Sequence, residues 1–136
     1  MLRISQLRID QEAVGAGEWI EAGDAYPGLI LRVRGYTDRY HDAMKRAMRV
    51  KAVELRVSQD NLPNADSKAV TARVVRDELF IDVRGAGADD GSEMTADMFG
   101  ALLVNPDYWS LVLLVQDVAL RVGRGFEADI GAATKN

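Results

Sequence analysis

The chain has 136 residues, of which 48% are hydrophobic and 28% charged, and its formal net charge is −4. This length suits one domain with its own core, and the apolar fraction is too high for a generally disordered chain. Because cysteine is absent, the composition excludes a disulfide scaffold, a thiolate metal site and a cysteine nucleophile. His41 is the single histidine, so a His-rich metal cage is also excluded, and we expect neither metal nor cofactor.

Hydropathy and charge indicate in which cellular environment this protein acts and which classes of partner it can bind. The longest apolar run, residues 111–115, is far shorter than the ~20 residues that cross a bilayer, and the N-terminus lacks the apolar centre of a signal peptide. We therefore expect a protein of the cytoplasm with no membrane contact. Residues 37–56 hold six Lys/Arg against three Asp/Glu, whereas residues 77–136 hold four against eleven. This acidic half argues against nucleic acid as the main ligand.

Residues 1–36 show the pattern of short β-strands. Leu2 and Ile4 alternate with polar residues, and glycines bracket a short segment, 18–21, that carries a tryptophan. Residues 29–34 alternate regularly, with leucine and valine on one face and arginine on the other. We predict two or three antiparallel strands in a hairpin or meander.

Residues 37–122 show helical spacing in four segments. The first is capped at Thr37 or Asp38 and runs to about residue 55. The second extends from about residue 66 to 82, although residues 79–83 could also form a strand, and a glycine-rich loop follows at 85–92. Thr95 begins the third helix, and Pro106 begins the fourth, which ends near residue 122.

The predicted fold is therefore a single α+β domain over residues 1–136. A small N-terminal antiparallel β-sheet (1–36) precedes a bundle of about four helices (37–122). The remaining segment, 123–136, is rich in glycine and alanine, and we predict that it is a flexible tail.

Motifs for catalysis or ion binding are incomplete. His41 and Asp42 are adjacent on a predicted helix and do not face each other. Residues 89–93 lack the ligand spacing of a calcium loop, the glycine groups fit no phosphate-binding motif, and no serine lies in a nucleophile elbow. We predict no catalytic residue and no enzymatic activity. An alternative is a small enzyme that uses carboxylates around the sheet, namely Glu18, Glu21 and Asp82.

The helix predicted over residues 106–122 is apolar on more than one face. Such a helix is either buried on several sides or in contact with a partner. Aromatic residues typically anchor protein interfaces, although they also fill cores. We assign partner contact to five residues, Phe99, Leu103, Trp109, Val112 and Leu113. Two cations on the basic helix, Arg46 and Arg49, are expected to add electrostatic attraction.

Several short motifs also occur in a recognisable order. They are Gly17-Glu18-Trp19, Leu29-Ile30-Leu31-Arg32-Val33-Arg34, Leu79-Phe80-Ile81-Asp82, Asp89-Asp90-Gly91 and Leu102-Leu103-Val104-Asn105-Pro106-Asp107-Tyr108. Over about residues 15–122 this order resembles the tail assembly chaperones of long-tailed, siphovirus-like bacteriophages.

The resemblance implies a non-enzymatic protein of the host cytoplasm. Members of that family bind the tape measure protein, keep it soluble, recruit tail tube subunits, and leave before the virion matures. Repeated weak binding along a long partner gains from multivalency, so we also expect a homo-oligomer. An alternative in the same setting is a permanent virion component, such as a neck or tail-completion protein.

Overall fold

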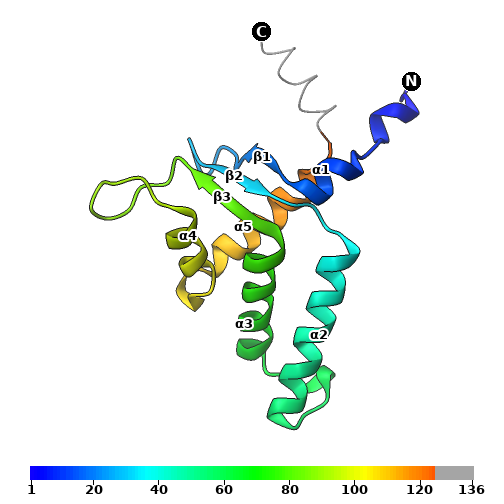
Figure 1. Ribbon diagram of the computed structural model, residues 1–136, viewed down its shortest axis with the longest axis vertical. Coiled ribbons are helices and arrows are strands. Elements are labelled where there is room, and N and C mark those ends of the chain that lie inside the picture. Colours follow the sequence, from blue (N-terminus) through cyan, green and yellow to red (C-terminus); the bar gives the residue numbers. More distant parts are fainter. Residues whose placement is uncertain (125–136) are drawn as a thin grey trace.

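The computed structural model describes residues 1–124, which form an α+β fold (Figure 1). One antiparallel sheet has the order β1-β2-β3, with the strands Glu18–Glu21, Ile30–Val33 and Phe80–Arg84. The described residues form five α-helices: α1 (Gln11–Ala16), α2 (Asp38–Leu55), α3 (Asn64–Val74), α4 (Ala96–Leu103) and α5 (Trp109–Arg121). The predicted fold class, a small antiparallel sheet with a set of helices, is confirmed.

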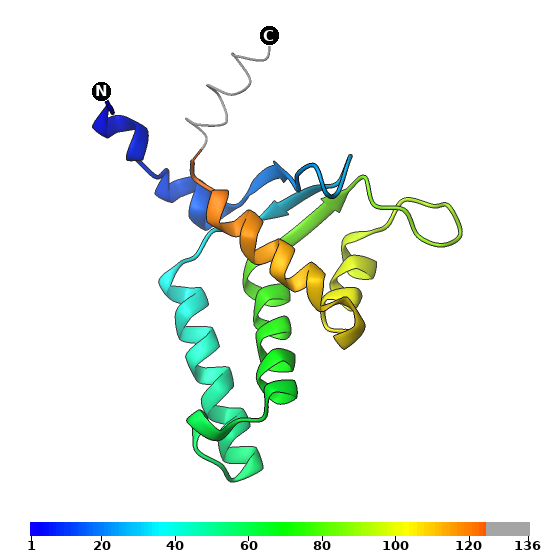
Figure 2. The same cartoon turned by 180° about the vertical axis from the view of Figure 1, so that it is seen from behind.

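One face of the sheet forms the centre of the core. Leu31 and Val33 of β2 are fully buried, and Leu31 pairs across the sheet with Ile20 and Val83. Figure 2 shows α5 crossing this face, where its residues Val112, Val115 and Val118 are fully buried. The predicted alternation in residues 29–34 is confirmed, because Leu29, Leu31 and Val33 are buried and the residues between them are only partly buried.

The helices α2 and α3 form a hairpin that extends away from the sheet (Figure 1). The hydroxyl of Thr37 caps α2 by accepting a hydrogen bond from Tyr40 N–H at 3.2 Å. The start and end of the first predicted helix are confirmed. Thr95 caps α4 in the same way, through the N–H of Met98, so this predicted start is also confirmed.

The second predicted helix ends earlier than expected. α3 continues as a single π-helical segment, Val75–Leu79, and the chain then enters β3 at Phe80. The prediction of helix up to residue 82 was wrong at this end. The sheet has an open edge beside β2, and pairing of β3 at this edge buries Val83 against Leu31. This packing is more favourable than continuing the helix that the local spacing predicts. Hence the third strand comes from the middle of the chain.

The N-terminal residues differ from the predicted strand. Residues Ile4–Leu7 form a 3-10 turn, and the chain before α1 projects from the body as an exposed arm (Figures 1 and 2). Leu2 and Ile4 are 64% and 78% exposed, because no neighbouring strand is there to pair with them. Sequence reasoning also missed α1. The residue that could have indicated this helix is Asp10, which caps its N-terminus. The Asp10 carboxylate accepts hydrogen bonds from two N–H groups of the first helical turn.

The C-terminal end of α5 is tied to the start of the chain. Gly123 N–H donates to the carboxylate of Glu18 at 3.2 Å, and its carbonyl accepts from Asp10 N–H at 2.7 Å. Arg121 donates to the carbonyls of Glu21 and Ala22, at 3.0 and 3.1 Å. Gly123 is therefore part of the fold, although we predicted a flexible tail from this residue onward. Arg124 is also described, and the remaining residues of that predicted tail, 125–136, lie outside the described residues.

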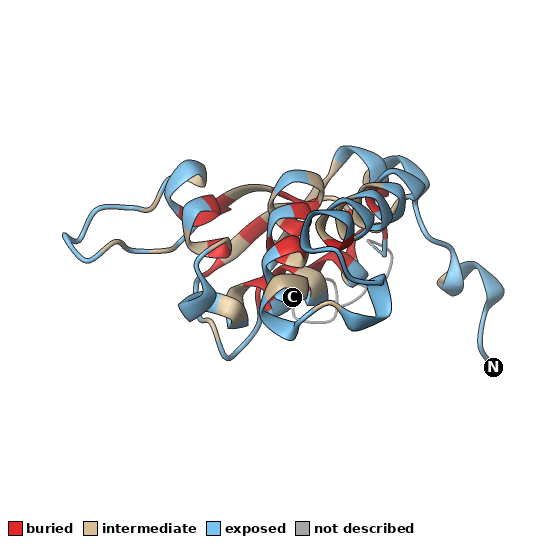
Figure 3. Cartoon of the chain, turned by 90° about the horizontal axis from the view of Figure 1, so that it is seen from below, coloured by how far each residue is buried: buried red, intermediate tan, exposed pale blue. Residues whose placement is uncertain are grey.

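Buried residues gather where the sheet, α5, α4 and the sheet-proximal end of α3 meet (Figure 3). Phe80 of β3 and Phe99 of α4 stack there with ring centroids 5.0 Å apart. The loop that follows β3 extends from this body, and its residues 85 and 87–93 are mostly exposed, as predicted for a glycine-rich connection.

Candidate functional site

The five apolar residues assigned to partner contact do not form one surface. Phe99, Leu103 and Val112 are 2%, 1% and 0% exposed, so they belong to the core, and the prediction that they form a contact surface is not supported by their positions. They face inward because α4 and α5 pack against the sheet and against each other. Leu113 is 50% exposed and Trp109 is half-buried.

Trp109 borders a cavity of about 310 Å³ between α3 and the α4–α5 turn. The lining comes from residues 64–72 of α3, the end of α4 and the turn itself, and it is mainly apolar. Its residues are Asn64, Ala65, Lys68, Ala69, Ala72, Leu103, Val104, Asn105, Pro106 and Trp109. We call this cavity the Trp109 pocket. Its shape suits an apolar side chain, since a concave apolar surface with few polar groups is typical of a binding site.

Local sequence explains why Trp109 faces this pocket. The side chain of Asn105 accepts a hydrogen bond from Asp107 N–H at 3.0 Å, and Pro106 opens the turn that precedes α5. This turn bends the chain by 96° between α4 and the helical segment that follows. The bend places the first residue of α5 beside the start of α3.

Small residues on α3 leave the space that forms the pocket. Ala65, Ala69 and Ala72 recur at helical spacing along one face of the helix. The ammonium of Lys68 lies 5.4 Å from the centre of the Trp109 ring, where a cation–π contact is favourable. Sequence reasoning missed these residues. The alanine spacing was a visible signal, but it gained meaning only when the turn brought Trp109 opposite to it.

The exposed face of α5 is separate from the Trp109 pocket. Leu113 and Leu120 are 50% and 58% exposed and lie two turns apart on this helix. Asp117, between them, is also exposed. This stripe is small, and of the residues assigned to partner contact it contains Leu113 alone.

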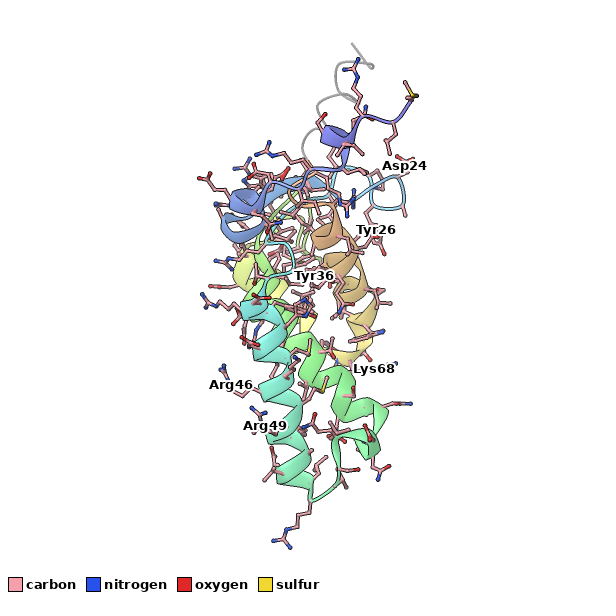
Figure 4. The ribbon with its side chains drawn as sticks, turned by 90° about the vertical axis from the view of Figure 1, so that its right-hand side faces the viewer. Asp24, Tyr26, Tyr36, Arg46, Arg49 and Lys68 are labelled. Carbon is pink, nitrogen blue, oxygen red and sulfur yellow. The ribbon has the colours of Figure 1, made fainter. Side chains whose placement is uncertain are left out.

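The two cations assigned to the partner surface lie elsewhere in the fold. Arg46 and Arg49 are exposed on α2. Figure 4 shows both side chains projecting from α2 on the side away from α5, whereas Lys68 projects from α3 on the side of α5. Electrostatic attraction from Arg46 and Arg49 therefore acts on a different surface from that of the Trp109 pocket.

An aromatic cluster joins β2 to α2. The rings of Tyr36 and Tyr40 meet edge to face with centroids 5.0 Å apart, and His41 lies against both. The Tyr36 hydroxyl donates to the carbonyl of Gln116 on α5 at 3.2 Å. Burial, with a smaller contribution from Tyr40 and Asp117, raises the pKa of Tyr36 to about 12. Tyr40 is the buried member of the cluster, whereas His41 is exposed and contacts it only through the two tyrosine rings.

The carboxylates of the alternative enzymatic hypothesis have separate roles. Glu18 accepts the N–H of Gly123, and Asp82 accepts the N–H of Val83 at 2.8 Å. Glu21 is exposed and lines a cavity beside the β1–β2 turn whose lining includes neither of the other two. The three carboxylates therefore do not converge on that cavity.

The acidic loop after β3 is organised by its own hydrogen bonds. Asp90 accepts from the N–H and the hydroxyl of Ser92, at 2.9 and 2.5 Å, and these bonds lower the pKa of Asp90. Across residues 1–124, no three His, Asp or Glu side chains are grouped so that they could hold a metal ion. In the same part of the chain no single helix could span a membrane. Only α4 and Pro106–Arg121 together have the length and composition, and they are sharply bent.

Comparison with known proteins gives no further assignment: no family model, curated protein or solved structure matches this chain.

Proposed function

We propose that this protein is a bacteriophage tail assembly chaperone that binds the tape measure protein and helps to recruit tail tube subunits. The observation that supports this most directly is the Trp109 pocket, an apolar cavity with an aromatic wall at the surface of the fold. The order of sequence motifs that resembles the family supports the same function. A tape measure protein is a long helix, and apolar stripes on a helix are recognised by concave apolar surfaces.

In this proposal an apolar side chain of the tape measure protein enters the pocket between Ala69 and Trp109. Leu103 forms part of the lining and is itself almost fully buried, so the pocket has a rigid wall. Lys68 stands at the same site and favours a carboxylate beside the bound apolar side chain. Binding of this kind needs no bond to be made or broken.

The test is co-expression with the tape measure protein of the same phage genome, followed by affinity capture at moderate salt. The variant Ala69→Leu fills the pocket from an exposed helical position and is expected to reduce retention about tenfold, which corresponds to ~1.4 kcal/mol of binding free energy. The matched control is Ala101→Leu, the same substitution at an exposed position of α4 outside the pocket.

Two results would contradict the proposal. One is the absence of retention by the unmodified protein, and the other is equal retention by both variants. Finding the chain in purified mature particles would instead favour the alternative of a permanent neck or tail-completion protein.

A further inference from the structure

A second concave surface lies between α2 and α3. It is a shallow groove of about 270 Å³ that is lined by both helices of the hairpin: Ala43, Arg46, Ala47, Val50, Arg73, Val74, Asp77 and Glu78. We call it the hairpin groove. None of its lining residues belongs to the lining of the Trp109 pocket.

The floor of the hairpin groove is apolar and made of small side chains. Ala43, Ala47 and Val50 are spaced by one helical turn on α2, and Val74 faces them from α3. Val50 is 58% exposed, and Val53, one turn further on, is 72% exposed. Small residues let another helix approach closely, so a third helix laid along the groove would cover these valines and complete a three-helix packing.

The two carboxylates that line the groove are already paired with arginines outside its lining. Glu78 already pairs with Arg39 at 2.9 Å, and Asp77 pairs with Arg76 at 2.8 Å.

In contrast to Arg39 and Arg76, the arginines that border the groove have no carboxylate partner in the described part of the chain. Within residues 1–124, Arg46, Arg49 and Arg73 have no carboxylate oxygen within 4.0 Å. Arg46 and Arg73 line the groove from opposite helices, and Arg49 lies one turn along α2 from Arg46. Each helix therefore contributes to the rim one arginine that has no carboxylate partner within 4.0 Å among the described residues, beside an apolar floor.

We propose that the hairpin groove is a docking site for an acidic amphipathic helix of a partner protein. The apolar stripe of that helix would cover Ala47, Val50 and Val53, while its flanking carboxylates would meet Arg46 and Arg73. A protein helix fits better than an anionic membrane because the surface is concave and its exposed apolar side chains are short. This inference goes beyond the proposed function and does not depend on it, since it concerns a different surface.

The experiment uses the full chain and a fluorescently labelled peptide of about 18 residues, the length of about five helical turns. The peptide has alanine and leucine on one helical face and glutamate on both flanks. A scrambled peptide of the same composition removes the amphipathic face but keeps the charge. Fluorescence anisotropy is measured at about 50 mM and about 300 mM salt, because screening separates charge attraction from apolar contact.

Two protein variants locate the binding site. The double variant Arg46→Glu/Arg49→Glu is expected to weaken binding about tenfold or more, because attraction becomes repulsion. Ala47→Gln fills the floor without a change of charge and is also expected to weaken binding. The matched control, Arg3→Glu/Arg8→Glu, makes the same change of charge on the N-terminal arm and is expected to bind like the unmodified protein. Circular dichroism verifies that each variant is folded.

Three results would overturn the proposal. In the first, the amphipathic and scrambled peptides bind equally. In the second, the control on the arm loses as much affinity as the groove variants. In the third, the protein does not bind the peptide but binds vesicles of phosphatidylglycerol through Arg46 and Arg49, which would mean that this surface binds a membrane.

Discussion

The hydroxyl of Tyr36 connects two parts of the fold that are distant in sequence. It donates to the carbonyl of Gln116, so one hydrogen bond joins the segment before α2 to the middle of α5. Burial favours the neutral phenol and raises the pKa of Tyr36 to about 12, compared with an ordinary value of 10. The folded state therefore holds this proton more tightly than the unfolded state does.

This difference predicts how stability depends on pH. Below pH 10 the phenol is neutral in both states, so the stabilising contribution is fully present. Between pH 10 and about 12 only the unfolded state loses the proton, and the contribution falls as pH rises. Urea unfolding of the wild type and the Tyr36→Phe variant across pH 8–12 measures this contribution to the free energy of unfolding. We expect the variant to be about 0.5–1.5 kcal/mol less stable below pH 10, and the gap to shrink above it. A gap that stays constant across this range would contradict the prediction.

At the scale of elements, two glycines let the backbone approach closely where β2 begins and β3 ends. Gly85 follows β3 with φ +78°, and an added Cβ would overlap the carbonyl oxygen of Gly28, which precedes β2. Both the backbone conformation and the missing side chain are therefore required at this point. Strands β2 and β3 can pair to their ends, from Val33 with Phe80 to Ile30 with Arg84, only if Gly85 has no side chain.

Gly85→Ala is predicted to reduce the free energy of unfolding by about 2 kcal/mol or more. The cost of a left-handed conformation at alanine adds to the cost of the overlap between its Cβ and the backbone of Gly28. The control is Gly87→Ala, two residues further along the same loop. A Cβ there meets nothing within 4 Å, and we expect a change within about 0.5 kcal/mol. Chemical denaturation of both variants gives the comparison. Equal stability of the two variants would show that β2 and β3 do not approach each other as described.

The elements also show which features could be predicted from the sequence. The caps at Thr37 and Thr95 and the alternation around Leu31 are local signals, and each predicted the observed element. The change from helix to strand at Phe80 is not local, because it depends on the free edge of β2. The Trp109 pocket could not be predicted either, since it exists only where the α4–α5 turn meets α3.

At the scale of the whole molecule, the two concave surfaces lie on separate parts of the helical layer. The Trp109 pocket lies on the side of α3 that faces α5, and the hairpin groove lies between α3 and α2. Arg46, on the groove, and Lys68, at the pocket, project in different directions from the hairpin (Figure 4). One chain could therefore hold an apolar helical segment and an acidic helix at the same time. Such simultaneous binding raises the effective concentration of one partner near the other.

The N-terminal arm contributes little to the stability of the fold. Leu2, Ile4 and Leu7 are 64%, 78% and 61% exposed, so they bury little surface within their own chain. The folded body begins at Asp10, whose N–H donates to the carbonyl of Gly123. Removal of residues 2–8 is therefore expected to change the free energy of unfolding by less than about 0.5 kcal/mol, as for surface substitutions. Urea denaturation measures this, and light scattering on the same samples reports whether the predicted homo-oligomer persists. A loss of about 2 kcal/mol or more in a truncated chain that scatters as a monomer would mean that the arm packs on its own body.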